Sequence, residues 1–230
     1  MSVETPTCRL VSRALTHTGY QRENNEDALL EMPEAGFWAV ADGMGGHADG
    51  AYASRAAVEA LSSAGTVYSG RRLVSSVEPA LQEVNAHLLA RAQQLGFGQV
   101  VGTTVVTLIL EGEHFHCFWA GDSRLYLWRE GELRRVTRDH TAPVNGRSGG
   151  LTRAVGAAAS LELDYTRGYL YENDFFLLCS DGLNKVVDDE ALAAYLSEHA
   201  PETVCSRLLE AALARGGPDN ISCVTVFLEN

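Results

Sequence analysis

The spacing of hydrophobic residues changes along this chain in an order that restricts the fold strongly. Strand-like runs come first, two helical segments follow, more strands come next, and two further helices precede a final strand. Two antiparallel sheets packed face to face, with a helix pair on each outer face, account for this order. We therefore expect an α+β fold with four αββα layers, a central antiparallel β-sandwich flanked by helix pairs. Strands are expected at 9–15, 28–32, from 37 to Asp42, 103–110, 114–120, 125–129, 133–136, 161–170, 174–180 and 221–228, and helices at 51–64, 73–95, 189–198 and 201–215.

The length of 230 residues and the 46% hydrophobic composition allow a sizeable core. The sequence contains no internal repeat and no obvious linker, so a single domain over residues 1–230 is expected. Residues 139–156 have little apolar periodicity and predict an irregular surface segment.

The net charge of −12 argues against a nucleic-acid or anionic-membrane surface, because phosphate binding depends mainly on Lys and Arg. Five cysteines are scattered without a CxxC pair, which is typical of reduced, buried thiols. The N-terminal residues lack the uninterrupted apolar core of a signal peptide, and the longest nearly uncharged stretch, 100–110, is too short to cross a bilayer. We expect a cytoplasmic protein and, by default, a monomer.

The stretch FWAVADGMGGH, residues 37–47, is an apolar run that ends in Asp42-Gly43 and continues into a glycine-rich turn. A buried strand that delivers a carboxylate to its exposed end can present a metal ligand or a catalytic group. Ordinary strands also enter turns in this way, so the stretch alone does not define a site.

Three more aspartates stand in the same context as Asp42, each at the edge of an apolar run with a glycine close by: Asp122, Asp181 and Asp219. If these strand ends point the same way, the carboxylates converge, and divalent cations would relieve their mutual repulsion. Ligation by oxygen alone selects Mg2+ or Mn2+ over Zn2+, and the seven histidines show no HExxH spacing. A Gly43 carbonyl can serve as a ligand, and Arg22 is the nearest candidate for binding a phosphate.

Five short motifs together resemble the metal-dependent Ser/Thr protein phosphatase family, the protein phosphatase 2C type, in its compact bacterial form. They occur in the family's order between residues 19 and 222. The motifs are Arg22-Glu23-Asn24-Asn25-Glu26-Asp27, Asp42-Gly43-Met44-Gly45-Gly46-His47, Gly121-Asp122-Ser123-Arg124, Ser180-Asp181-Gly182 and Gly217-Pro218-Asp219-Asn220-Ile221.

The resemblance implies a β-sandwich fold and two Mn2+ or Mg2+ ions. Asp42, Asp181 and Asp219 would ligate the first ion, and Asp42 with the Gly43 carbonyl would ligate the second. Glu26 and Asp27 would act through metal-bound waters, with Asp27 orienting the nucleophile. Asp122 with Asp181 would hold a weaker third ion, and Arg22 would bind the substrate phosphate.

Two positions depart from the family pattern. Met44 stands where many eukaryotic members have a histidine proposed as general acid, which makes His47 the substitute candidate, with packing or capping at a helix N-terminus as its alternative role. The flap-like segment at about 139–156 is short and lacks the usual acidic helix and histidine. Arg147 and Arg153 are candidates there for recruiting phosphosubstrates or are simply solvated loop charges.

The leading hypothesis is a phosphoprotein phosphatase that acts on phosphoserine and phosphothreonine by direct attack of a metal-activated water. Its partners would be phosphorylated proteins and, as the resemblance implies, an opposing bacterial Ser/Thr protein kinase. The alternatives are a catalytically silent phosphoprotein-binding pseudophosphatase and a metal-dependent nucleotidase or nuclease.

Overall fold

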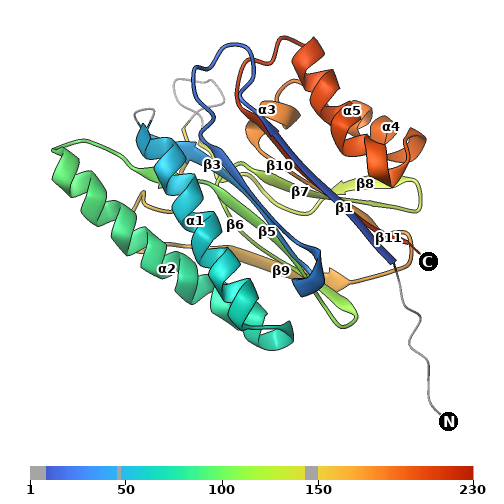
Figure 1. Ribbon diagram of the computed structural model, residues 1–230, viewed down its shortest axis with the longest axis horizontal. Coiled ribbons are helices and arrows are strands. Elements are labelled where there is room, and N and C mark those ends of the chain that lie inside the picture. Colours follow the sequence, from blue (N-terminus) through green and yellow to red (C-terminus); the bar gives the residue numbers. More distant parts are fainter. Residues whose placement is uncertain (1–8, 46–47, 143–149, 230) are drawn as a thin grey trace.

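A computed structural model of the chain describes residues 9–45, 48–142 and 150–229. Within them, two antiparallel sheets pack face to face (Figure 1). The first sheet has the strand order β1 (Arg9–His17), β11 (Ile221–Glu229), β10 (Phe175–Cys179), β7 (Arg124–Arg129), β8 (Glu132–Arg135). The second has the order β2 (Asp27–Met32), β3 (Phe37–Met44), β5 (Val105–Glu111), β6 (His114–Ala120), β9 (Asp164–Tyr169), and the short β4 (Gly102–Thr103) pairs with the end of β3. A 3-10 turn, η1 (Pro33–Ala35), joins β2 to β3.

Helices cover both outer faces of the sandwich. The long helices α1 (Ala48–Val67) and α2 (Gly70–Leu95) pack on the second sheet, and α4 (Asp189–Glu198) and α5 (Pro201–Ala214) pack on the first (Figure 1). Small side chains such as Ala53 and Ala57, both fully buried, let α1 lie close against its sheet. The expected four-layer αββα architecture is confirmed.

Strand β3 is buried on both faces, which explains its continuous apolar run. Phe37 and Ala39 point into the core between the second sheet and its helices, whereas Trp38 and Val40 point into the core between the two sheets. Because successive side chains of a strand alternate between faces, both faces must be apolar for β3 to lie in the middle of the sandwich. The central position of β3 therefore fixes the C-terminal end of this strand, which carries Asp42.

A short helix was not predicted from the sequence. The single-turn helix α3 (Asp181–Asn184) follows β10 directly, with Leu183 fully buried beneath it. Gly182 is required there, because a Cβ atom at this position would lie 1.9 Å from the Asn220 carbonyl oxygen. A strand was also expected from residue 161, but β9 begins at Asp164.

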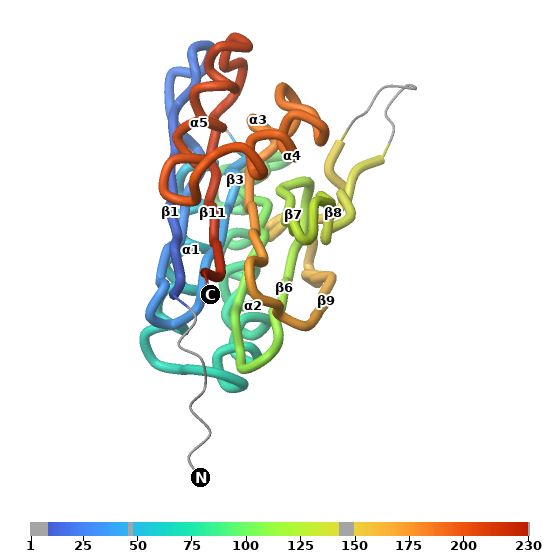
Figure 2. Tube along the Cα trace, turned by 90° about the vertical axis from the view of Figure 1, so that its right-hand side faces the viewer, coloured from blue at the N-terminus to red at the C-terminus, as the bar shows by residue number. Residues whose placement is uncertain are grey.

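The flap-like segment has paired ends. In the described parts, the Ala142 N–H donates to the Gly150 carbonyl (3.0 Å) and the Thr152 N–H donates to the His140 carbonyl (2.8 Å), so the two arms run side by side (Figure 2). Apart from these contacts, the described part of residues 139–156 forms no helix or strand, as expected for an irregular segment. Arg147 lies outside the described residues, and Arg153 is held by Asp164 at 2.6 Å.

Four of the five cysteines fall within the described residues, and all four are free and buried, as expected: Cys117, Cys179, Cys205 and Cys223. Among the described residues, no helix has the length and apolar character needed to span a bilayer.

Candidate metal-binding site

The predicted aspartates meet in one cleft of about 440 Å³ at one end of the sandwich. The cleft forms at this end of the sandwich because β3 and β10 finish there. Their neighbours β5 and β11 begin there. Of the predicted site residues, the cleft is lined by Arg22, Glu26, Asp42, Gly43, Asp122, Asp181 and Asp219. Asp27 lies beside it, largely buried, and His47 lies outside the described residues.

The wall formed by β2 and β3 fixes Asp42 through its backbone. Asp42 stands directly opposite Asp27 in the antiparallel register. Its N–H donates to Thr104 Oγ1 (3.1 Å), and its carbonyl accepts from the Thr104 N–H (2.8 Å). These contacts leave the carboxylate available for a ligand.

Gly43 continues this wall, and its N–H donates to the Glu26 carbonyl (3.1 Å). A Cβ atom there would lie 2.1 Å from the Gly50 carbonyl oxygen and 2.6 Å from that of Glu26. Only glycine therefore lets the first turn of α1 and the loop before β2 close around this backbone.

Asn220 ties the polar loop before β2 to the opposite wall. Its Nδ2 donates to the carbonyls of Thr18 (2.8 Å) and Asn24 (2.9 Å), and its Oδ1 accepts from the Glu26 N–H (2.8 Å). The loop that contains Arg22 and Glu26 is thus fixed relative to Asp219 by one amide side chain.

Mutual repulsion and burial raise the pKa of several carboxyl groups. Burial is the main cause for Asp27, whose pKa is raised to about 7 although Ser222 and Ser180 stabilise its anion. Burial, then the charges of Asp27 and Asp181, raise the pKa of Asp42 well above its usual range. Burial and Asp181 raise that of Asp122 to about 6. The cleft holds more negative charge than the protein alone compensates.

This excess charge gives a pH dependence in the metal-free protein. The pKa of Asp27 is about 7 in the folded protein and about 3.9 in the unfolded chain, so the folded state binds this proton more tightly. The contribution of the protonated Asp27 to stability is therefore full below pH 4 and is lost as pH rises to 7. With EDTA present, we expect the stability of Asp27→Asn relative to wild type to increase between pH 4 and 7, measured by urea unfolding. A difference that stays constant across this range would contradict the shift.

The donor set fits hard divalent cations. Among the described residues, the Oδ1 atoms of Asp27 and Asp181 are buried without a hydrogen-bond partner. Buried carboxylate oxygens of this kind suit the ligation of a hard cation. No three His, Cys, Asp or Glu side chains of the described chain yet converge on one point. Two of the carboxylates instead pair with basic side chains: Asp219 accepts from Arg22 Nη2 at 2.8 Å, and Asp181 pairs with Lys185.

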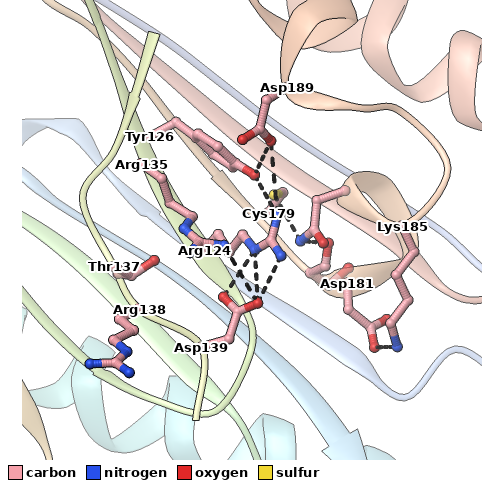
Figure 3. Close-up of polar contacts among 12 residues, drawn as sticks. Arg124, Tyr126, Arg135, Thr137, Arg138, Asp139, Cys179, Asp181, Lys185 and Asp189 are labelled. Atoms are coloured by element: carbon pink, nitrogen blue, oxygen red, sulfur yellow. Dashed lines mark hydrogen bonds and ion pairs between the residues drawn. The ribbon is translucent and has the colours of Figure 1, made fainter. Parts of the chain in front are cut away.

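A second polar network is centred on Arg124 (Figure 3). Arg124, two residues after Asp122, binds Asp139 through Nε and Nη2 (2.7–3.3 Å), and its Nη1 donates to the Tyr126 hydroxyl (2.8 Å). Tyr126 in turn donates to Asp189 at the start of α4 (2.8 Å). This network joins the Gly121-Asp122 turn to the base of the flap and to α4.

A larger cavity of about 730 Å³ lies between α2 and the β6–β9 edge, lined by His116, Tyr165 and Arg167 among others. It contains none of the predicted aspartates. The smaller acidic cleft is the better candidate for the active site, because chemistry depends on its charged groups rather than on its volume.

The fold and this acidic cleft together define a class, the metal-dependent phosphatases of the αββα sandwich type. The family model for protein phosphatase 2C matches residues 16–214. The chain therefore belongs to the protein phosphatase 2C family.

Individual relatives agree with this assignment. Serine/threonine protein phosphatase PstP of Mycobacterium tuberculosis is 32% identical over 92% of this chain, which spans 43% of that protein's length. The chain is also similar to the solved structure of PppA, a key regulatory component of T6SS in Pseudomonas aeruginosa. The two share 39% sequence identity with a TM-score of 0.86, over 95% of this chain and 99% of that one. The PstP catalytic domain in complex with two manganese ions is 32% identical with a TM-score of 0.84, over 96% and 100% of the two chains.

Proposed function

We propose that this protein hydrolyses phosphoserine and phosphothreonine in proteins at a binuclear Mn2+ or Mg2+ centre. The single observation that supports this most is the meeting of Asp42, Asp122, Asp181 and Asp219 in one cleft together with a guanidinium group, that of Arg22. Such a cleft suits phosphate monoesters, because divalent cations and a guanidinium can share the charge of the phosphoryl group.

Asp42, Asp181 and Asp219 are the proposed ligands of the first ion, and Asp42 with the Gly43 carbonyl those of the second. Glu26 completes this arrangement through water. When bound, the two ions would supply the acidity of a water molecule and neutralise charge on the phosphoryl oxygens. Asp122 with Asp181 is the proposed position of a weaker third ion.

The chain's own groups then orient and protonate the reactants. Arg22, whose side chain is 55% exposed, exchanges Asp219 for the substrate phosphate. Asp27 orients the attacking water. The water oxygen bonds to phosphorus while the bond to the seryl or threonyl oxygen breaks, and His47 is the proposed donor of the proton that this oxygen takes up.

The biological setting is proposed on the same basis. The substrates are phosphorylated proteins, and the opposing enzyme is a Ser/Thr protein kinase. A single domain over residues 1–230, a monomeric state and a cytoplasmic location complete the proposal, and the free, buried cysteines support a reducing compartment. The named relatives are protein phosphatases, which gives no support to a pseudophosphatase or a nucleotidase.

Phosphate release from a phosphothreonine peptide tests this function. We expect turnover with Mn2+, a loss of roughly 100-fold or more with excess EDTA, and recovery when Mn2+ is restored, because the water depends on the ions for its acidity. A nucleoside monophosphate serves as the comparison substrate. Turnover that resists EDTA, or a preference for the nucleotide, would contradict the proposal.

A further inference from the structure

Lys185 is the only lysine in the sequence, and it lies in the acidic cleft. At all other Lys or Arg positions the residue is arginine. Arginine carries a delocalised charge and a planar fork of hydrogen-bond donors, whereas lysine is a compact point charge. The position of this one ammonium group among the proposed metal ligands is therefore informative.

The one-turn helix α3 sets the position of Lys185. Residues four apart lie on one face of a helix, and the Lys185 N–H donates to the Asp181 carbonyl (2.9 Å) at the end of this turn. The Lys185 ammonium pairs with Asp181 Oδ2 (Figure 3), whereas Asp181 Oδ1 is buried without a hydrogen-bond partner. The two oxygens of this carboxylate thus have different roles.

Asp122 lies on the same side of the cleft. It lines the cleft with Asp181 and Lys185, and its charge is repelled by Asp181 and attracted by Lys185. The ammonium also interacts with Asp122 and Asp219. A positive charge therefore already stands where Asp122 and Asp181 would bind a third cation.

We propose that Lys185 is a built-in cation that competes with a third metal ion at the Asp122–Asp181 face of the cleft. This inference rests on the proposed binuclear function and restricts it to two tightly bound ions. Asp181 keeps Oδ1 for the first ion, while a third ion must displace the ammonium from Oδ2 and then remain near a like charge. The Lys185 side chain is 61% exposed, so solvent screening limits the effect to roughly tenfold in affinity.

Counting bound Mn2+ by equilibrium dialysis tests this competition. Wild type is expected to hold two ions, and Lys185→Met should bind a third roughly tenfold more tightly than wild type does. Lys185→Arg, which keeps the charge, should resemble wild type. Arg207→Met is the matched control, because it removes an exposed cation (55% exposed) from an ion pair on α5, away from the cleft.

A third ion bound equally by wild type and Lys185→Met would overturn the inference and leave the binuclear function standing. Wild type that binds no Mn2+ in the cleft would instead overturn the function itself. Reductive 13C-methylation provides a measurement that needs no variant, since the chain has one lysine signal to follow by NMR. Because the first ion binds the other oxygen of Asp181, that signal should move slightly with the first two Mg2+ ions and make its large shift, on leaving Asp181, only with a third; the large shift with the first two ions would contradict the competition.

Discussion

Asp42→Asn is expected to lose roughly 10³-fold or more in kcat for a phosphopeptide, with loss of Mn2+ binding at both proposed sites. Asp42 is the one side chain proposed to contact both ions, and its backbone is already fixed by Thr104. The amide keeps the shape and the backbone contacts of the carboxyl group but removes the charge that the ions need. Steady-state kinetics and equilibrium dialysis measure the two effects.

The same substitution should stabilise the metal-free protein. Burial and the charges of Asp27 and Asp181 raise the pKa of Asp42, so folding at pH 7 requires either a proton or uncompensated repulsion at this site. Asparagine needs neither, and we expect a gain of about 1 kcal/mol, or roughly 2–4 °C in Tm with EDTA. Glu210→Gln on the exposed surface of α5 is the control and should change neither activity nor Tm. A lower Tm for Asp42→Asn would mean that a folding defect explains its inactivity.

Gly43→Ala is expected to destabilise the protein by about 3 kcal/mol, among the largest effects of a single methyl group in this fold. The added Cβ would meet the carbonyl oxygens of Gly50 and Glu26 at 2.1 and 2.6 Å, and neither backbone can retreat without moving α1 or the loop before β2. Urea unfolding measures the loss. We also expect weaker Mn2+ binding, since the displaced backbone includes the proposed Gly43 carbonyl ligand.

Gly131→Ala separates this steric effect from backbone strain. Gly131, in the β7–β8 turn, has φ of +84° and open space around it, so alanine there costs only about 1–2 kcal/mol of conformational strain. If Gly43→Ala proved no more destabilising than Gly131→Ala, the close packing around Gly43 would be wrong.

Hydrophobic periodicity was sufficient to predict the layers of the fold. The continuous apolar run of β3 and the alanine spacing of α1 each follow from burial on specific faces, so each can be recognised locally. The strand-edge aspartates could also be recognised, because a carboxylate beside an apolar run and a glycine is visible in the sequence. All four aspartates line one cleft, and their role as metal ligands stays a prediction.

Other parts of the site could not be predicted, because they depend on contacts between distant segments. The single turn of α3 has too few residues to show a periodic pattern, so the placement of Lys185 four residues after Asp181 carried no helical signal. Asn220 was visible within a motif, but its three hydrogen bonds join residues about 200 positions away. The lysine's uniqueness in the composition was the one clue available.

Anomalous diffraction at the manganese edge, from crystals grown with Mn2+, tests the central claim most directly. Two strong peaks about 3.5–4 Å apart are predicted in the acidic cleft, with the Asp42 carboxylate in contact with both. Any third peak beside Asp122 should be weaker and should strengthen in Lys185→Met. A cleft without manganese peaks, or peaks bound elsewhere on the protein, would contradict the assignment of Asp42, Asp181 and Asp219 as metal ligands.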